Sequence, residues 1–136
     1  MKTSFYLTAF CLVSISIFLF CAKLTNNTGN ISITVNENDD AYKLTASFDP
    51  AATTRVLHYI NSSIRGTGGS YFDETTRRID VTTRLGDNTE FYIKESAGEL
   101  KIKLDKRKNS YASYMRIKRM CEGIKNVLAG KQENLK

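Results

Sequence analysis

Hydrophobic and polar residues alternate over much of the chain, in short runs separated by polar turns. Residues 31–35 and 41–48 each place apolar or small side chains at every second position, and the polar residues 36–40 (NENDD) lie between them. Alternation with a period of two is typical of strands that bury only one face. The pattern therefore predicts a β-hairpin at the start of the domain.

A second group of strands is predicted in the middle of the chain. Residues 77–85, 90–95 and 99–104 alternate in the same way, with turn residues at 86–88 and 96–98 between them. Residues 70–72 suggest a further short edge strand. The inward positions of the three longer strands are then Ile79, Val81, Leu85, Phe91, Ile93, Leu100, Ile102 and Leu104.

Two segments show helical spacing instead of alternation. Asp49-Pro50 favours a helix start. The Asp49 carboxylate can accept hydrogen bonds from the free backbone amides of the first turn. Proline suits the first helical position, because the backbone N–H that it lacks would have no partner in the helix there. This first helix places Val56, Leu57, Ile60 and Ile64 on one side and ends at residues 66–69 (GTGG). The second spans residues 110–129 and stops at Gly130; its apolar stripe is Tyr114, Ile117, Cys121, Ile124 and Leu128.

The predicted order of elements, ββα-βββα, indicates the α+β class. One antiparallel sheet with both helices packed on one face would bury every apolar face and leave the other side of the sheet in water. We expect a single domain over residues 31–130 and a polar tail over residues 131–136. Cys121 is the only cysteine of this domain, so the domain holds no internal disulfide.

The first 22 residues predict a signal-anchor or a signal peptide. Residues 5–22 contain no charged side chain, and 18 residues in a hydrophobic helix span about 27 Å, close to the ~30 Å hydrocarbon core of a bilayer. Residues 23–30 (KLTNNTGN) are a polar linker. We therefore expect a membrane-anchored protein whose domain faces the periplasm or the extracellular space.

Two alternatives to a retained anchor stay open. Cleavage and secretion would require small residues before the cut, but cutting after Cys21 or Ala22 leaves Leu19 or Phe20 at the third position before it. Cys21 also resembles the lipidated cysteine of bacterial lipoproteins in its position, although Phe20 occupies the place of a small residue. We rank the anchor first, secretion second and lipidation of Cys21 third.

The net charge of +6 is unevenly distributed. Residues 23–100 hold eight Lys and Arg against eleven Asp and Glu, whereas residues 101–136 hold eleven against three. Strand alternation directs five basic residues and a tyrosine to the open face of the sheet: Arg78, Arg84, Tyr92, Lys94, Lys101 and Lys103. Asp80 relieves their charge, and Glu95 is placed at a strand end. Further cations follow at the rim and on the last helix: Lys106, Arg107, Lys108, Arg116, Lys118, Arg119 and Lys125.

Clustered cations favour contact with anionic material. The first functional hypothesis is a non-enzymatic, monomeric binding domain that uses the basic sheet face and the basic last helix to bind an anionic lipid, a glycan or a protein. Nucleic acid is not favoured, because the domain is expected outside the cell and carries one tyrosine on this face. Lysine and arginine also protect exposed strands from pairing, so the same face is compatible with a role in solubility alone.

The second hypothesis is a small envelope enzyme that uses carboxylates in a cleft, drawn from Asp49, Asp73, Glu74 and Asp80. No motif supports a particular reaction. His58 is the only histidine and lies in the middle of a predicted helix, so neither a hydrolytic triad nor a zinc site is indicated. The sequence therefore predicts no catalytic residue, no metal site and no cofactor.

Overall fold

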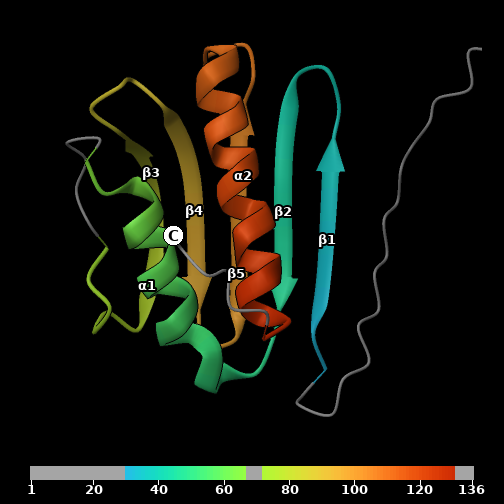
Figure 1. Cartoon of the computed structure of the whole chain (residues 1–136), viewed down its shortest axis with the longest axis vertical. Coiled ribbons are helices and arrows are strands. Elements are labelled where there is room, and N and C mark those ends of the chain that lie inside the picture. The colour runs from blue at the N-terminus through green and yellow to red at the C-terminus, as the bar shows by residue number, and fades with distance from the viewer. Residues whose placement is uncertain (1–29, 67–71, 131–136) are drawn as a thin grey trace, which may run out of the picture.

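The computed structural model describes residues 30–66 and 72–130, which form one five-stranded sheet and two helices (Figure 1). The order of strands across the sheet is β1-β2-β5-β4-β3, and every neighbouring pair is antiparallel. The α+β class predicted from the sequence is confirmed. The strands are β1 (Ser32–Glu37), β2 (Ala41–Ser47), β3 (Arg78–Arg84), β4 (Glu90–Ser96) and β5 (Glu99–Asp105).

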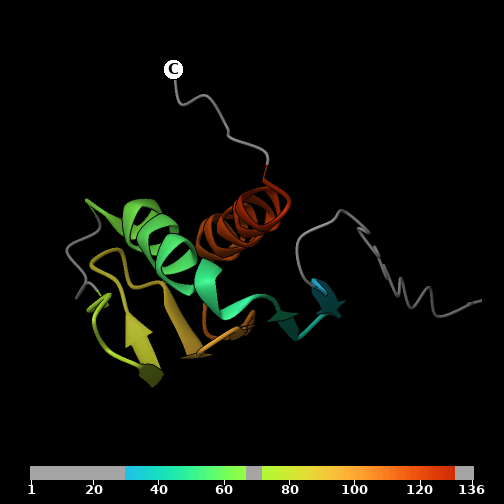
Figure 2. The same cartoon turned by 90° about the horizontal axis from the view of Figure 1, so that it is seen from below.

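Both helices lie on the same side of the sheet, and the other side is open (Figure 2). The first helical segment begins with a 3-10 turn, η1 (Pro50–Ala52), and continues as α1 (Thr53–Ile64). As predicted, Asp49 accepts a hydrogen bond from the backbone N–H of Ala51, at 2.9 Å. Helix α2 (Tyr111–Leu128) starts at Ser110, whose hydroxyl accepts a hydrogen bond from the N–H of Ser113.

The core lies between the sheet and the two helices. The predicted stripe of α2 is buried along its whole length, and so are the inward residues of β4 and β5. The helices approach each other closely where Tyr59 of α1 lies against Gly123 of α2. A Cβ atom on Gly123 would lie 1.6 Å from the Tyr59 hydroxyl, so any side chain here would displace the Tyr59 ring.

Three details of the strands differ from the predicted pattern. Val81 is 41% exposed, because β3 is an edge strand with a neighbour on one side only. Glu95 lies within β4 on the inner face and is 1% exposed, although the sequence pattern placed it at a strand end. Phe72 belongs to no strand, and the rest of the predicted edge strand, residues 70–71, lies outside the described residues.

The predicted N-terminal segment and linker fall on residues 1–30, of which only residue 30 is described, and the predicted tail, residues 131–136, also lies outside the described residues. Over residues 30–66 and 72–130, no helix combines the length and the apolar character needed to cross a bilayer.

Candidate functional site

The open face of the sheet carries the six residues that alternation directed to it. Opposed residues of antiparallel strands point to the same side. Arg78, Asp80, Thr82 and Arg84 of β3 face outward with their partners on β4, and the partners of β4 on β5 continue the same face. The structure therefore brings together Arg78, Arg84, Tyr92, Lys94, Lys101 and Lys103 on one surface.

Four lysines at the centre of this face form two directly opposed pairs, and we call them the lysine block. Lys43 of β2 is paired with Lys103 of β5, and Lys101 of β5 is paired with Lys94 of β4. Like charges that face each other across strands destabilise a sheet by up to about 1 kcal/mol a pair. None of the four ammonium groups forms an ion pair within the described part of the chain.

Lys43 is the member of this block that sequence reasoning did not include. Alternation already placed it on the outer side of its strand, so its direction was available. Its neighbours in the sheet could not be predicted, because β5 lies between β2 and β4 and no local pattern indicates that order. The sheet order alone puts Lys43 beside Lys103.

Local contacts engage two outer groups of the same face, the cation Arg84 and the acid Asp80. Arg84 donates a hydrogen bond to Glu90 at 2.6 Å, and this bond lowers the pKa of Glu90. The Tyr92 hydroxyl donates to Asp80 at 2.8 Å, which raises the pKa of Tyr92. Asp80 is opposed to Lys94 in the register, but its carboxylate contacts Tyr92. The cations of this face without an ion pair among the described residues are therefore the four lysines of the block and Arg78 on the edge strand β3.

The cations of α2 do not extend this surface, because the helix lies on the opposite side of the sheet (Figure 2). Three of them are also paired with acids: Arg116 with Asp87 at 3.0 Å, Lys118 with Glu37 at 2.9 Å, and Lys125 with Glu122 at 2.8 Å. The sequence pattern treated the sheet face and the helix as one basic region, and the fold separates them.

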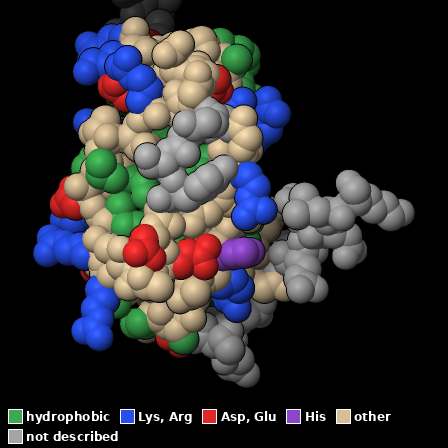
Figure 3. All heavy atoms as spheres, turned by 90° about the vertical axis from the view of Figure 1, so that its left-hand side faces the viewer, with side chains coloured by type: hydrophobic (Ala, Val, Ile, Leu, Met, Phe, Trp, Pro, Cys, Tyr) green, Lys and Arg blue, Asp and Glu red, His purple; other side chains and the backbone are tan. Residues whose placement is uncertain are grey.

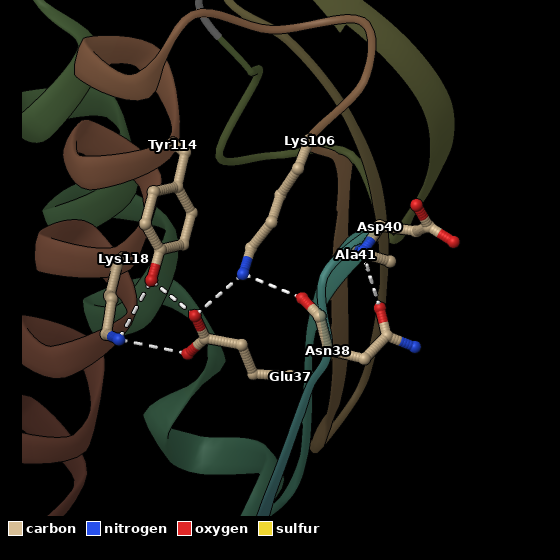
Figure 4. A network of polar contacts seen from close by, with 7 residues as sticks. All are labelled: Glu37, Asn38, Asp40, Ala41, Lys106, Tyr114 and Lys118. Atoms are coloured by element: carbon tan, nitrogen blue, oxygen red, sulfur yellow. Dashed lines mark hydrogen bonds and ion pairs between the residues drawn. The ribbon is translucent and has the colours of Figure 1, made fainter.

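A separate polar cluster joins the edge strand β1 to α2 (Figure 4). The Glu37 carboxylate accepts hydrogen bonds from Lys106 at 2.8 Å, from Lys118 at 2.9 Å and from the Tyr114 hydroxyl. Partial burial alone would raise the pKa of Glu37, but these hydrogen bonds outweigh it and lower the pKa to about 2. Glu37 is therefore an ionised clamp between the first hairpin and the last helix.

The four carboxylates considered for catalysis are used locally and do not converge. Asp49 caps η1, and Asp73 accepts hydrogen bonds from Thr75. Asp80 lies on the open face, whereas Glu74 contacts the exposed side chain of His58 of α1, at 3.2 Å. Figure 3 shows acidic side chains next to the histidine on that flank of the molecule. Within the described residues, no three His, Cys, Asp or Glu side chains are grouped to hold a metal ion.

Cys121 of α2 and Glu95 of β4 are buried ionisable groups between the sheet and the helices. Burial raises the pKa of the Cys121 thiol to about 12, so this thiol stays protonated near neutral pH. Burial also raises the pKa of Glu95, whose two carboxylate oxygens have no hydrogen-bond partner in the described part of the structure. Glu95 shares its parity with Phe91 and Ile93, so the alternation of β4 contained the signal that it points inward.

Comparisons of the chain with protein-family models, with curated proteins and with solved structures found no match in any of the three. A function is therefore inferred from the surface of the domain itself.

Proposed function

We propose that this chain is a non-enzymatic binding domain, tethered to a membrane through residues 5–22, whose lysine block contacts an anionic partner. The partner class is a surface of negative groups: a lipid headgroup layer, an acidic glycan or an acidic protein face. The tether follows from the uncharged N-terminal run of the sequence. The contact face follows from the charges of the open sheet.

One observation carries the proposal: the unpaired lysines lie on central strands. Lysines on an edge strand prevent unwanted pairing, but β2, β5 and β4 are already paired on both sides. Edge protection therefore explains Arg78 and Arg84 on β3 and leaves the lysine block unexplained. An anion bound over the opposed pairs Lys43–Lys103 and Lys94–Lys101 would offset their mutual repulsion.

The test uses residues 29–136 without the apolar run, after circular dichroism has shown that this fragment folds. Vesicles with anionic lipids, vesicles with only neutral lipids and an acidic polysaccharide serve as probes. Binding to the anionic probes should weaken as salt shortens the screening length from about 10 Å at 0.1 M to about 3 Å at 1 M. If the wild-type fragment bound none of the anionic probes at low salt, the lysine block would serve only to keep the domain soluble.

Matched variants separate the block from total charge. The double variant Lys94→Gln, Lys101→Gln removes one opposed pair and should lose most binding while its stability stays equal or rises slightly. The control Arg55→Gln, Arg119→Gln removes the same charge from the exposed surface of the helices and should bind like the wild type. Equal losses in both variants would show that net charge, rather than this face, attracts the anion.

The tether is tested separately by intact mass and carbonate extraction of the full chain from its own membranes. A retained anchor should resist extraction with its first 22 residues present. An unmodified new N-terminus after residue 22 would establish secretion, and a diacylglycerol mass on Cys21 would establish lipidation.

A further inference from the structure

The two edges of the sheet differ in the charges they carry. The edge strand β3 holds three charged side chains, Arg78, Asp80 and Arg84. The other edge, β1, has no lysine, arginine or proline, and its one charged residue is Glu37. Charged side chains and proline are common means of preventing an edge strand from pairing with another chain. Strand β1 lacks this protection.

Glu37 does not supply the missing protection. It is the last residue of β1, and it is turned to the inner side of the sheet, where it is paired with the buried Tyr42. Its two carboxylate oxygens are already engaged by Lys106 and Lys118 of the same chain. The outer edge of β1 therefore presents no uncompensated charge.

The apolar inner face of the sheet continues up to this edge. Ile33 and Val35 of β1 are paired with Ala46 and Leu44 of β2. The β2 residues are 2% and 0% exposed, but the two β1 side chains are only half-buried. Figure 2 shows the reason: both helices lie over the inner strands, and β1 extends beyond them.

We infer that β1 pairs antiparallel with β1 of a second copy of this chain, so that a dimer replaces the monomer expected from the sequence. A two-fold axis at Thr34 places Ile33 opposite Val35 of the second copy on the inner side. On the open side it places Thr34 opposite Thr34, and Ser32 opposite Asn36. Opposed residues point to the same face, so over residues 32–36 this register joins apolar to apolar and polar to polar residues. Beyond them, Glu37 lies opposite Ile31 of the second copy, and no two like charges are opposed.

The positive charge of the open face does not prevent this pairing. Lys43 on β2 is the member of the lysine block nearest to the edge. The two β2 strands would be three strand spacings apart, about 14 Å, which exceeds the ~8 Å screening length at physiological salt. The pair would place two lysine blocks on one continuous sheet face. The inference does not rest on the proposed function, because β1 pairing involves no anion.

The experiment measures the mass of the full chain in micelles of a neutral detergent, by sedimentation over a range of concentrations. The wild type should dimerise. Thr34→Lys places two like charges opposite each other at the axis and should be monomeric, and so should Thr34→Glu. The matched control is Thr82→Lys, the same substitution on the open side of the other edge strand β3, and it should dimerise like the wild type.

A mixing experiment tests the register itself. Differently tagged Thr34→Lys and Thr34→Glu chains should co-purify as a mixed dimer, because opposite charges then meet at the axis. A wild type that stays monomeric at every concentration would overturn the inference. So would a dimer that survives Thr34→Lys, since another surface would then hold it, or folded variants that fail to form the mixed dimer.

Discussion

Two glutamates on the inner side of the same sheet have opposite surroundings. Glu37 ends the edge strand β1; its side chain is 29% exposed and contacts Lys106, Lys118 and Tyr114. Glu95 lies in β4, between two neighbouring strands and under the helix layer, and it is 1% exposed. Neither of its carboxylate oxygens has a hydrogen-bond partner among the described residues.

The pKa values of the two groups move in opposite directions for this reason. The pKa of Glu37 is lowered to about 2 because three hydrogen-bond donors reach its carboxylate, whereas burial without a partner raises the pKa of Glu95. Lysine side chains can reach an edge carboxylate while their stems cover apolar surface. Among the described residues, no donor reaches the Glu95 carboxylate in the middle of the sheet. Position in the sheet therefore decides whether an inward acid stabilises the fold.

The largest expected effect comes from removing the buried charge. Glu95→Leu should raise the free energy of unfolding at pH 7 by about 1–3 kcal/mol, the cost of burying a polar group without a partner. Urea denaturation measures the change. The control Glu99→Leu removes an exposed carboxylate from the open side of the neighbouring strand and should stay within about 0.5 kcal/mol of wild type. Destabilisation by Glu95→Leu would contradict the environment described for this carboxyl.

Neutralising the edge carboxylate should act in the other direction. Glu37→Gln leaves Lys106 and Lys118 close together without an anion and should lower the free energy of unfolding by about 1–2 kcal/mol. Glu122→Gln is the matched control, because it removes one partly exposed pair with Lys125 and should cost at most about 0.5 kcal/mol. Equal effects in the two variants would mean that the cluster adds nothing to an ordinary surface pair.

The pH dependence of stability should show both groups with opposite signs. The stabilisation from Glu37 is complete above pH 4.5, its ordinary pKa. It is lost as the pH falls from 4.5 towards the folded-state pKa of about 2. For Glu95 the folded state holds the proton longer than the unfolded state, so stability falls as pH rises above 4.5 through the raised pKa. Each slope is at most about 1.4 kcal/mol per pH unit. Subtracting the free energy of unfolding of Glu37→Gln or Glu95→Gln from that of the wild type at each pH isolates the contribution of each group. If a variant and the wild type had the same slope of stability against pH, the replaced glutamate would not cause the pH dependence.

The smallest expected effect concerns one donor of the cluster. Lys118→Met keeps the aliphatic contact and leaves Glu37 with Lys106 and Tyr114, so the loss of stability should be below about 1 kcal/mol. Lys125→Met is the control. It removes an ion pair with Glu122, and its loss of stability should be near zero. Thermal unfolding of the three proteins provides the measurement. A loss as large as that of Glu37→Gln would show that Lys118 alone holds the carboxylate.

Local patterns in the sequence were sufficient for most of the fold. The stripe from Tyr114 to Leu128 predicted which side of α2 is buried, and Asp49 marked the start of the first helix, where the structure confirms its capping bond. Helical and strand periods are local, so a few neighbouring residues suffice to read them. The candidate face was predictable to the same degree, since alternation alone gives the direction of Lys94, Lys101 and Lys103.

The sequence by itself therefore determined the elements, their inner and outer faces and the class of the fold. Only the tertiary structure decided which of those faces are neighbours. The insertion of β5 between β2 and β4 pairs Lys43 with Lys103, and the docking of α2 brings Lys118 to Glu37, 81 residues away. The same packing buries Glu95 on the inner side of the sheet, where its carboxylate has no hydrogen-bond partner within residues 30–66 and 72–130. Such contacts depend on how the whole set of apolar faces packs together, and no short stretch of sequence contains that information.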